Sequence, residues 1–397
     1  MFKPLAGTRV LDLTNVLAGP FCSHQLVHTG AEVIKVEVAG RGDLARQLGA
    51  DAELNLRSMG VSYLAQNAGK KSVTLNLKHP DGKRLFRRLV ETADVVLENF
   101  RPGVMTRLGL GYEDLKAIRP DLIYCAISGF GQDGPWVHRP AYDQIIQGVS
   151  GAMSITGGTD SAPLRVGYPI ADTVGGITAA FAIAAALNAS PRGAFIDVSM
   201  LESVLATMGW AVSNYLIAGV EPQPNGNENP TSAPSGAFQA GGGLINIAAN
   251  KDEQWELLTD HLGLSALRDR PEYATRELRK KNRYALKAEL EAVLTTRPAR
   301  EWARELNRLG VPAGAILTVP EVLSTPQIAD RGFLARYADV PGVGHDIQVA
   351  TTGIKVDGAP LTVDDPPPRL GQHNDSVWKE LGLADSELDR LKRDGVL

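Results

Sequence analysis

The sequence contains little cysteine and no strong excess of charge. Cys22 and Cys125 are the only cysteines in 397 residues, too few for a disulfide framework, so a reduced cytoplasmic compartment is expected. The net charge of −4 provides no global basic field that would attract nucleic acid or an anionic membrane. We therefore expect neither kind of partner, and a polyanionic ligand would need a local cluster of basic residues.

Several common catalytic and targeting patterns are also missing. The chain has no GxxxxGK[ST], HExxH or GxSxG motif, and no GxGxxG follows its first predicted strand. Its seven histidines are scattered without ligand spacing, so no metal site is expected. The N-terminus does not resemble a signal peptide, and the longest apolar run, 177–189, is too short to cross a bilayer. We expect that run to form a buried helix.

The first half of the chain alternates between strand and helix patterns. Helices are predicted at 20–30 and within 79–93, between short apolar segments that are typical of buried parallel strands. The predicted strands are 8–14, 31–37, 72–78, 94–100, 121–128 and 193–201. This alternation predicts an α/β fold, with a Rossmann-like large domain built on a parallel sheet.

The pattern changes after residue 220. Segment 221–236 is rich in Pro, Asn and Gly and is predicted to be a linker that ends the N-terminal part, 1–220, of the large domain. Residues 237–329 contain polar helical patterns and are expected to form a smaller α+β domain. The tail, 330–397, has short strands, a proline run and a last helix predicted at 376–383.

One acid stands in an unusual context. Asp172 lies in the stretch GYPIADTVGG, 167–176, directly before the long apolar run. It could be a helix cap, because aspartate oxygens accept hydrogen bonds from first-turn amides. It could instead be a nucleophile in a dry pocket. The stretch alone leaves both interpretations open.

Seven stretches, taken in order along nearly the whole chain, together resemble the family III CoA-transferases, the group of formyl-CoA transferase and carnitine CoA-transferase. Among them are LDLTNVLAGPF, NAGKKSVTLNLK, ENFRPGVMTRLGLGY, AYDQIIQGVSG, GYPIADTVGG and PRLGQHND. The resemblance implies that segment 330–397 returns to the large domain and that two chains form an interlocked homodimer. It also implies that a CoA thioester is a substrate and that no cofactor is bound permanently.

The resemblance assigns Asp172 as the nucleophile. An acyl-aspartyl anhydride retains the energy of the thioester for the next step, and the positive end of a helix would favour the ionised carboxylate. Gly175 and Gly176 would leave room for the acyl thioester. Gly242 and Gly243, with Gly241, are implied to form a mobile loop over the site, although a plain hairpin turn explains tandem glycines equally well.

Coenzyme A carries several phosphates, so basic residues are candidate ligands, although each could equally be a solvated surface charge. The expected CoA-binding residues are Asn15, Val16, Ala18, Lys71, Lys78, Asn99, Phe100, Arg101, Arg107 and Tyr142, with Lys70 as a further candidate. Arg46 and Arg165 could pair with a free substrate carboxylate, although either could equally be a surface or structural arginine. Ala68 stands where many relatives carry arginine, which puts one CoA contact in doubt.

Two alternatives to the transferase stay open. Related racemases carry Gly-His-Asp where this chain has Ala141, Tyr142 and Asp143. A tyrosine is a poor base at neutral pH, which disfavours racemisation. The other alternative is a CoA-binding protein without turnover. Family habit favours succinyl-CoA as the donor and a short dicarboxylic acid as the acceptor.

Overall fold

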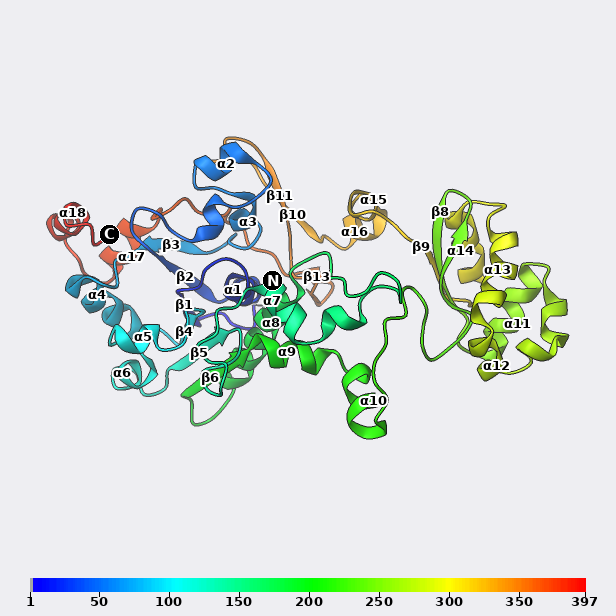
Figure 1. Cartoon of the computed structure of the whole chain (residues 1–397). Coiled ribbons are helices and arrows are strands. Elements are labelled where there is room, and N and C mark those ends of the chain that lie inside the picture. The colour runs from blue at the N-terminus through cyan, green and yellow to red at the C-terminus, as the bar shows by residue number, and fades with distance from the viewer. Residues whose placement is uncertain (1–2) are drawn as a thin grey trace. The chain divides into compact units, whose positions relative to one another are not determined.

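The computed structural model describes residues 3–397, which divide into two compact units (Figure 1). The large unit comprises Met1–Ala152, Arg165–Val220 and Pro326–Leu397. The small unit comprises Met153–Leu164 and Glu221–Thr325, so the segment expected as a linker belongs to it and contains the start of a strand at Ser235.

A six-stranded parallel sheet forms the centre of the large unit and confirms the predicted α/β fold. Its strand order is β3-β2-β1-β4-β5-β6. The strands are β1 (Arg9–Asp12), β2 (Glu32–Glu37), β3 (Lys71–Thr74), β4 (Val95–Glu98), β5 (Ile123–Ser128) and β6 (Ala194–Ser199). β3 ends earlier than predicted because the amide of Asn76 donates to the carbonyl of Val396 instead of continuing the sheet.

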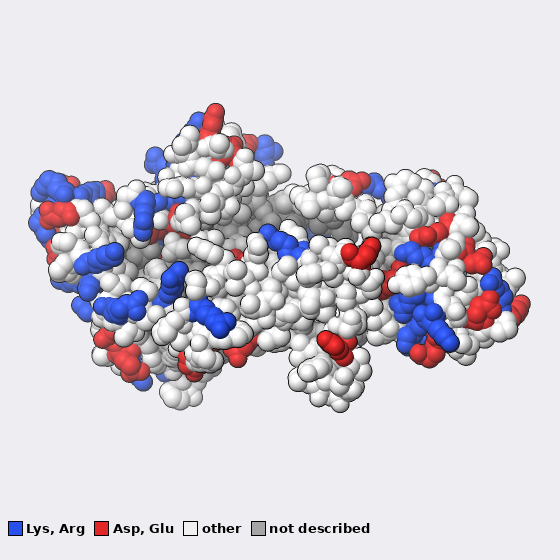
Figure 2. Space-filling model, viewed as in Figure 1, with Lys and Arg blue, Asp and Glu red and all other residues white. Residues whose placement is uncertain are grey.

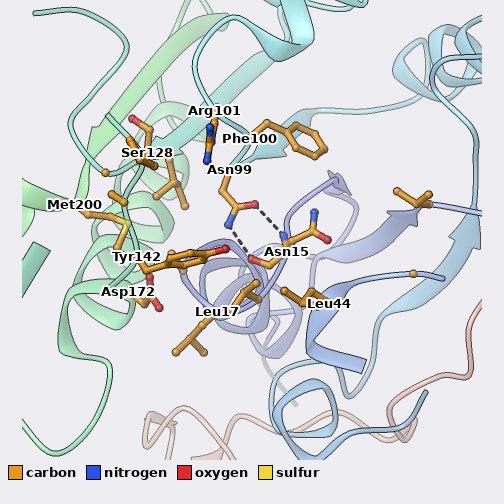
Figure 3. Close-up of a pocket in the computed structure, with 18 of the residues that line it drawn as sticks. Asn15, Leu17, Leu44, Asn99, Phe100, Arg101, Ser128, Tyr142, Asp172 and Met200 are labelled. Carbon is orange, nitrogen blue, oxygen red and sulfur yellow. Dashed lines mark hydrogen bonds between the residues drawn. The ribbon is translucent and has the colours of Figure 1, made fainter. Parts of the chain in front are cut away.

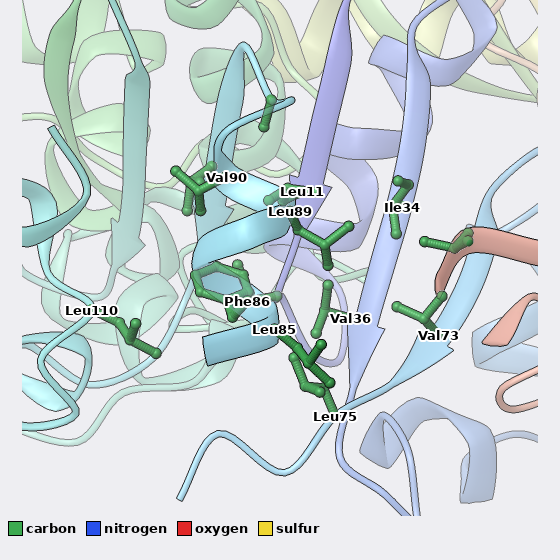
Figure 4. Packing of buried hydrophobic residues seen from close by; sticks show 14 of the residues in the cluster. Leu11, Ile34, Val36, Val73, Leu75, Leu85, Phe86, Leu89, Val90 and Leu110 are labelled. Atoms are coloured by element: carbon green, nitrogen blue, oxygen red, sulfur yellow. The ribbon is translucent and has the colours of Figure 1, made fainter. Parts of the chain in front are cut away.

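Helices cover both faces of this sheet. On one face, α4 (Pro80–Val90) packs Leu85, Phe86 and Leu89 against strand side chains such as Leu11 (Figure 4). The other face is covered by α1 (Ala18–His28), α8 (Ile170–Leu187) and α9 (Met200–Thr207). Burial on both faces explains why the central strands β4 and β5 are nearly continuous apolar runs.

Helix α8 departs from the expected fully buried helix. It buries one face, which includes Ala171, Ala179 and Ile183, whereas Phe181 and Ile177 on the opposite side are exposed. The helix is long and apolar enough to cross a membrane by length and composition, contrary to expectation, because it begins at Ile170. Its packing against α1, α9, β5 and β6 is that of a core helix in a folded domain.

The remaining elements of the large unit are short. They are α2 (Ala52–Leu56), α3 (Val61–Leu64), α5 (Val104–Arg107), α6 (Tyr112–Lys116), α7 (Asp143–Val149), α10 (Trp210–Ala218), α16 (Pro326–Asp330), β10 (Leu334–Tyr337), β11 (Ile347–Ala350), β12 (Lys355–Val356), β13 (Ala359–Pro360), α17 (Asn374–Glu380) and α18 (Asp385–Arg393). The tail therefore has a further helix, α18, after the one predicted as the last. Val377 and Trp378 of α17 join the core shared with α4.

The small unit has its own antiparallel sheet and core. Strands β7 (Ser235–Ala240), β8 (Gly243–Ala248) and β9 (Ala313–Ala315) pair in that order. The helices are α11 (Asp252–His261), α12 (Arg276–Lys281), α13 (Arg283–Leu294), α14 (Ala299–Arg308) and α15 (Val319–Leu323). Phe238 and Trp302 belong to its core.

Charged side chains of both signs are mixed on the surface of the large unit. On the face shown in Figure 2, basic and acidic residues lie close together over α4, α5, α6 and α18. Several of them form ion pairs, such as Arg84 with Glu387 and Arg390 with Asp81.

Candidate active site

A cavity of about 560 Å³ opens at the carboxyl edge of the parallel sheet. It lies where the strand order reverses between β1 and β4, which is the usual ligand-binding place in an open α/β sheet. Its walls come from the loops after β1, β2, β4 and β5, from the segment before α7, and from α1, α8 and α9 (Figure 3). The lining includes Asn15, Val16, Leu17, Ala18, Arg41, Leu44, Gln47, Asn99, Phe100, Arg101, Ser128, Tyr142, Asp172 and Met200.

Two asparagines join the loops after β1 and β4, on either side of the strand reversal, by hydrogen bonds. The amide nitrogen of Asn15 donates to Asn99 Oδ1 at 2.8 Å, and Asn99 Nδ2 donates to the Asn15 carbonyl at 2.8 Å (Figure 3). This reciprocal pair joins the end of β1 to the end of β4. The cavity wall on that side is therefore a fixed surface, to which both predicted asparagines contribute.

Val16 adopts a backbone conformation that is unusual for its residue type. Its φ is 68°, in the left-handed region that a β-branched residue rarely occupies. The amide of Val16 donates to Asp43 Oδ1 at 2.9 Å, and the other oxygen of Asp43 pairs with the buried Lys35 at 2.9 Å. Lys35 also donates to the carbonyl of Thr14 at 2.8 Å. The hydrogen bond from the Val16 amide to Asp43 thus holds the loop in its strained form, while Lys35 pairs with the other oxygen of Asp43.

Asp172 does not cap its own helix. Helix α8 begins at Ile170, two residues earlier, and Asp172 is the third residue of its first turn. The carboxylate of Asp143, on α7, takes the capping position instead, because its Oδ1 accepts from the amide of Ala171 at 2.8 Å. Within residues 3–397 no group donates a hydrogen bond to the Asp172 carboxylate, which lines the cavity. The cap interpretation is therefore wrong.

The surroundings of Asp172 disfavour its charge. Burial, and then the neighbouring charge of Asp143, raise the pKa of Asp172 to about 7. The helix start was expected to keep this carboxylate readily ionised. Burial and the charge of Asp143 outweigh that effect and raise the pKa of Asp172 instead. An aspartate that faces a cavity, accepts no hydrogen bond from the described residues and has a pKa near neutrality is a more basic and less solvated nucleophile than an ordinary surface aspartate.

The two glycines after Asp172 serve helix packing rather than ligand access. A Cβ at Gly176 would lie 2.5 Å from the carbonyl oxygen of Ala18, and one at Gly175 would lie 3.0 Å from Met200. Gly176 therefore allows α8 to approach α1 closely. This close packing sets the position of Asp172 relative to the loop that follows β1.

The structure brings most of the predicted CoA-binding residues to one place. Asn15, Val16, Ala18, Asn99, Phe100, Arg101, Tyr142 and Asp172 all line the cavity. Lys71, Lys78 and Arg107 are not among its lining residues; Lys71 pairs with Glu32, while Arg107 is exposed on α5. Arg165 lies 3.9 Å from Asp143 Oδ2 and is half exposed, beside the site.

Arg46 and Lys70 are structural residues, contrary to the sequence-based predictions. Arg46 is fully buried, and its guanidinium pairs with Glu37 and donates to the hydroxyl of Tyr63 and the carbonyl of Pro368. No surface remains on it for a substrate carboxylate. Lys70 is also buried, 3.3 Å from Asp12 and 2.7 Å from the hydroxyl of Ser23.

Gly242 and Gly243 lie at the tip of the hairpin between β7 and β8, in the small unit. Gly242 has a φ of 77°, and a Cβ there would meet no atom within 4 Å. The turn is thus the plain hairpin that was the alternative interpretation, and a role over Asp172 stays a prediction.

Sequence reasoning missed several residues of the cavity. Arg41 and Leu44 follow β2, and Ser128 ends β5, at the same edge as Asn99. The rule that ligands bind beyond the carboxyl ends of parallel strands would have found them. Asp43 and Asp143 were also missed as supports of the site, because their partners are distant in the sequence.

An open parallel sheet with a cavity at its strand reversal defines an α/β protein whose ligand-binding site lies at the carboxyl edge of the sheet. The chain belongs to CoA-transferase family III, whose model matches residues 5–374. The protein is therefore a CoA-transferase of that family, as the motifs predicted.

Relatives extend over the whole chain. A succinate–glutarate CoA-transferase of Agrobacterium fabrum is 39% identical, with 95% of this chain and 96% of the relative covered. The succinyl-CoA:glutarate CoA-transferase of Mus musculus is 37% identical over 100% of this chain and 90% of its own. A crystal structure of a CaiB/BaiF family protein from Brucella suis matches with a TM-score of 0.83 and 36% identity, covering 96% of this chain and all of that one.

Proposed function

We propose that this protein transfers CoA from succinyl-CoA to a short dicarboxylic acid, with Asp172 as the covalent nucleophile. The observation that carries the proposal is the Asp172 carboxylate, which lines the cavity without a hydrogen-bond donor and has a pKa raised to about 7 by burial and by Asp143. The names of the relatives support these substrates, since the two relatives described above are named as CoA-transferases between succinate, or succinyl-CoA, and glutarate.

The reaction proceeds in four exchanges at one carboxylate. An oxygen of Asp172 attacks the thioester carbonyl, the carbon–sulfur bond breaks, and an acyl-aspartyl anhydride and CoA thiolate result. The thiolate attacks the aspartyl carbonyl and releases succinate, which leaves an aspartyl-CoA thioester. The acceptor carboxylate attacks the carbonyl of that thioester, the carbon–sulfur bond breaks, and a second anhydride and CoA thiolate result. The thiolate then attacks the acceptor acyl carbon, and the product acyl-CoA and free Asp172 separate.

The cavity provides the contacts that the CoA thioester needs. The joined loops at Asn15 and Asn99 form one wall, while Arg101, and Arg41 which the sequence did not single out, provide positive charge for phosphates. Tyr142 lines the cavity near the reacting carboxylate. In this proposal the Gly242–Gly243 turn covers the site during transfer, and Arg165 meets the free carboxylate of the acid substrate.

A second copy of the chain completes the proposed enzyme. Helix α10 has no buried residue, and its Trp210, Leu216 and Ile217 are between 74% and 85% exposed. Phe181 on α8 is 76% exposed. Apolar side chains of this size are costly to leave in water, so these faces support the homodimer that the resemblance implied. Mass photometry would test the homodimer, since a monomer at assay concentration would contradict this part of the proposal.

The proposed compartment is the cytoplasm. The two buried free cysteines, Cys22 and Cys125, accord with it.

An acceptor screen tests the proposed activity. Succinyl-CoA is incubated with glutarate, mesaconate, oxalate and acetate, and each product acyl-CoA is identified by mass spectrometry. Formation of a dicarboxylyl-CoA by the wild type but not by Asp172→Ala is expected. Transfer by the Asp172→Ala variant at the wild-type rate would contradict the assigned nucleophile, and hydrolysis without transfer would contradict the assigned reaction.

A further inference from the structure

Asp143 is an acid beside the cavity that contacts the helix carrying Asp172. Its side chain is 7% exposed and touches the first turn of α8 directly. Oδ1 accepts from the amide of Ala171 at 2.8 Å and lies 3.5 Å from the amide of Asp172. Oδ2 accepts from Gln147 Nε2 at 2.7 Å, one turn further along α7. The amide of Ala171, in the first turn of α8, is thus satisfied from another helix.

This arrangement has a consequence for Asp172. An aspartate in the first turn of a helix ordinarily folds back to accept from nearby backbone amides, which lowers both its freedom and its basicity. Here Asp143 already occupies that place. The Asp172 carboxylate is left without a donor and available to the cavity (Figure 3).

We propose that Asp143 is a positioning residue for the transfer reaction, which caps α8 in place of Asp172 and holds a negative charge beside it. This inference rests on the proposed function of Asp172 and deepens it. Asp143 makes two separable contributions: its hydrogen bond fixes the start of α8, and its charge opposes ionisation of Asp172, which makes the ionised form a stronger nucleophile.

Several other ionisable groups surround Asp172 and must be distinguished from Asp143. Tyr142 precedes α7, Arg165 lies before α8, and Arg41 and Arg101 line the same cavity. Arg165 is 3.9 Å from Asp143 Oδ2 and half exposed, so solvent screens much of its effect.

Glu98 is the second acid whose titration could be confused with that of Asp172. Burial raises the pKa of Glu98 to about 7 as well, but Glu98 accepts from the amide of Phe100 at 2.7 Å and is not a lining residue of the cavity. The variant Glu98→Gln therefore serves as a control for the assignment of a pH midpoint near 7.

The two contributions can be separated by moving the charge. In the double variant Asp143→Asn with Gln147→Glu, the asparagine oxygen can still accept from Ala171, and its amide can donate to the new glutamate. Gln147 Oε1 accepts from the amide of Val166 at 2.9 Å, a bond that a glutamate also makes. The net charge is unchanged, but the negative charge is one hydrogen bond further from α8. Asp143→Ala removes both contributions.

The test measures kcat/KM for succinyl-CoA against pH in the full-length protein, with melting temperature recorded for each variant. The double variant is expected to lower the pH midpoint by about one unit, because a neighbouring negative charge is withdrawn. Asp143→Ala is expected to lower the rate at the high-pH plateau by about 10-fold to 100-fold, because Asp172 gains access to its own helix amides. Glu98→Gln should leave the midpoint at the wild-type value.

The controls distinguish failure of the inference from failure of the proposed function. If the double variant keeps the wild-type midpoint, the charge of Asp143 does not act on Asp172. If Asp143→Ala keeps the wild-type plateau rate, capping by Asp143 does not position Asp172. Either result overturns the inference while Asp172→Asn stays inactive. Transfer by Asp172→Asn itself would overturn the proposed function.

Discussion

Two aspartates in the large unit, Asp12 and Asp172, have pKa values shifted in opposite directions. Asp12, at the end of β1, is fully buried, yet it accepts from Ser23 and Thr14 and lies beside Lys70. Burial would raise its pKa, but the charges of Lys35 and Lys70 and these hydrogen bonds outweigh burial and lower the pKa to about 2. Asp172 is less buried and has no donor, and its pKa is raised to about 7.

The difference separates a structural acid, Asp12, from Asp172, the proposed nucleophile. The Asp12 network neutralises every charge within it, so it can hold the loops at the carboxyl edge of the sheet without reacting. In the proposed reaction, a bound substrate supplies the partner that the Asp172 carboxylate lacks. A carboxylate deprived of partners in a folded protein costs stability, which natural sequences tolerate where function requires it.

The largest expected effect is the loss of transfer when Asp172 is replaced. Asp172→Ala should lower kcat by at least about 10³-fold, the order of loss seen when a covalent nucleophile is removed. The exposed Asp389→Asn on α18 is a matched control and should keep wild-type activity. Steady-state rates of acyl-CoA formation provide the measurement, and comparable losses in both variants would contradict the contrast.

Replacement of Asp12 should have its main effect on stability. Asp12→Asn leaves Lys70 and Lys35 buried without one of their counter-charges, and we expect destabilisation by about 3–5 kcal/mol. Because the folded-state pKa of Asp12 is lowered to about 2, its contribution is complete above pH 4 and disappears only as pH falls through about 2. Urea denaturation at pH 7 measures the loss. A variant as stable as wild type would show that the network does not depend on this charge.

Asp43 connects the buried network of Asp12, Lys35 and Lys70 to the cavity. Replacing Asp43 tests whether the network and the cavity are independent. Asp43→Ala removes the acceptor for the Val16 amide, so the strained loop should relax and KM for the acyl-CoA should rise by about 10-fold. Asp43→Asn keeps an oxygen for that amide and should keep most of the affinity while it loses the ion pair with Lys35. Equal KM values for the two variants would indicate that the hydrogen bond to Val16 is unimportant.

The smallest effect is a gain of stability when the Asp172 charge is removed. The raised pKa means that folded Asp172 retains its proton up to about pH 7, whereas the unfolded chain loses it near pH 4. The ionised Asp172 carboxylate therefore lowers the free energy of unfolding by its full amount above pH 7, and this destabilisation vanishes as the pH falls towards 4. Asp172→Asn should be more stable than wild type at pH 8 by on the order of 1 kcal/mol, after allowance for solvent screening. Melting curves at pH 4 and pH 8 would show the convergence, and a constant difference would contradict it.

The parallel sheet and half of the cavity were predictable from the sequence, for a physical reason. Apolar runs and strand ends are local signals, so the strands and Asn99 at a strand end could be identified from them, whereas Asn15 and the α8 residue Asp172 were assigned through the family resemblance. The burial of a basic side chain is not a local property. Arg46 and Lys70 become structural only because Glu37 and Asp12 meet them across the fold. Asp143 caps α8 from 28 residues away, which no spacing rule reveals.

The covalent step is tested most directly by trapping. Wild type and Asp172→Ala are incubated with succinyl-CoA, treated with hydroxylamine, and measured by intact and peptide mass spectrometry. An aspartyl-CoA thioester or an aspartyl anhydride would be converted to an aspartyl hydroxamate, so the account predicts a small fixed mass gain that maps to Asp172 in the wild type alone. Transfer activity in the wild type without any mass gain at Asp172, or with the gain at another acid, would contradict it.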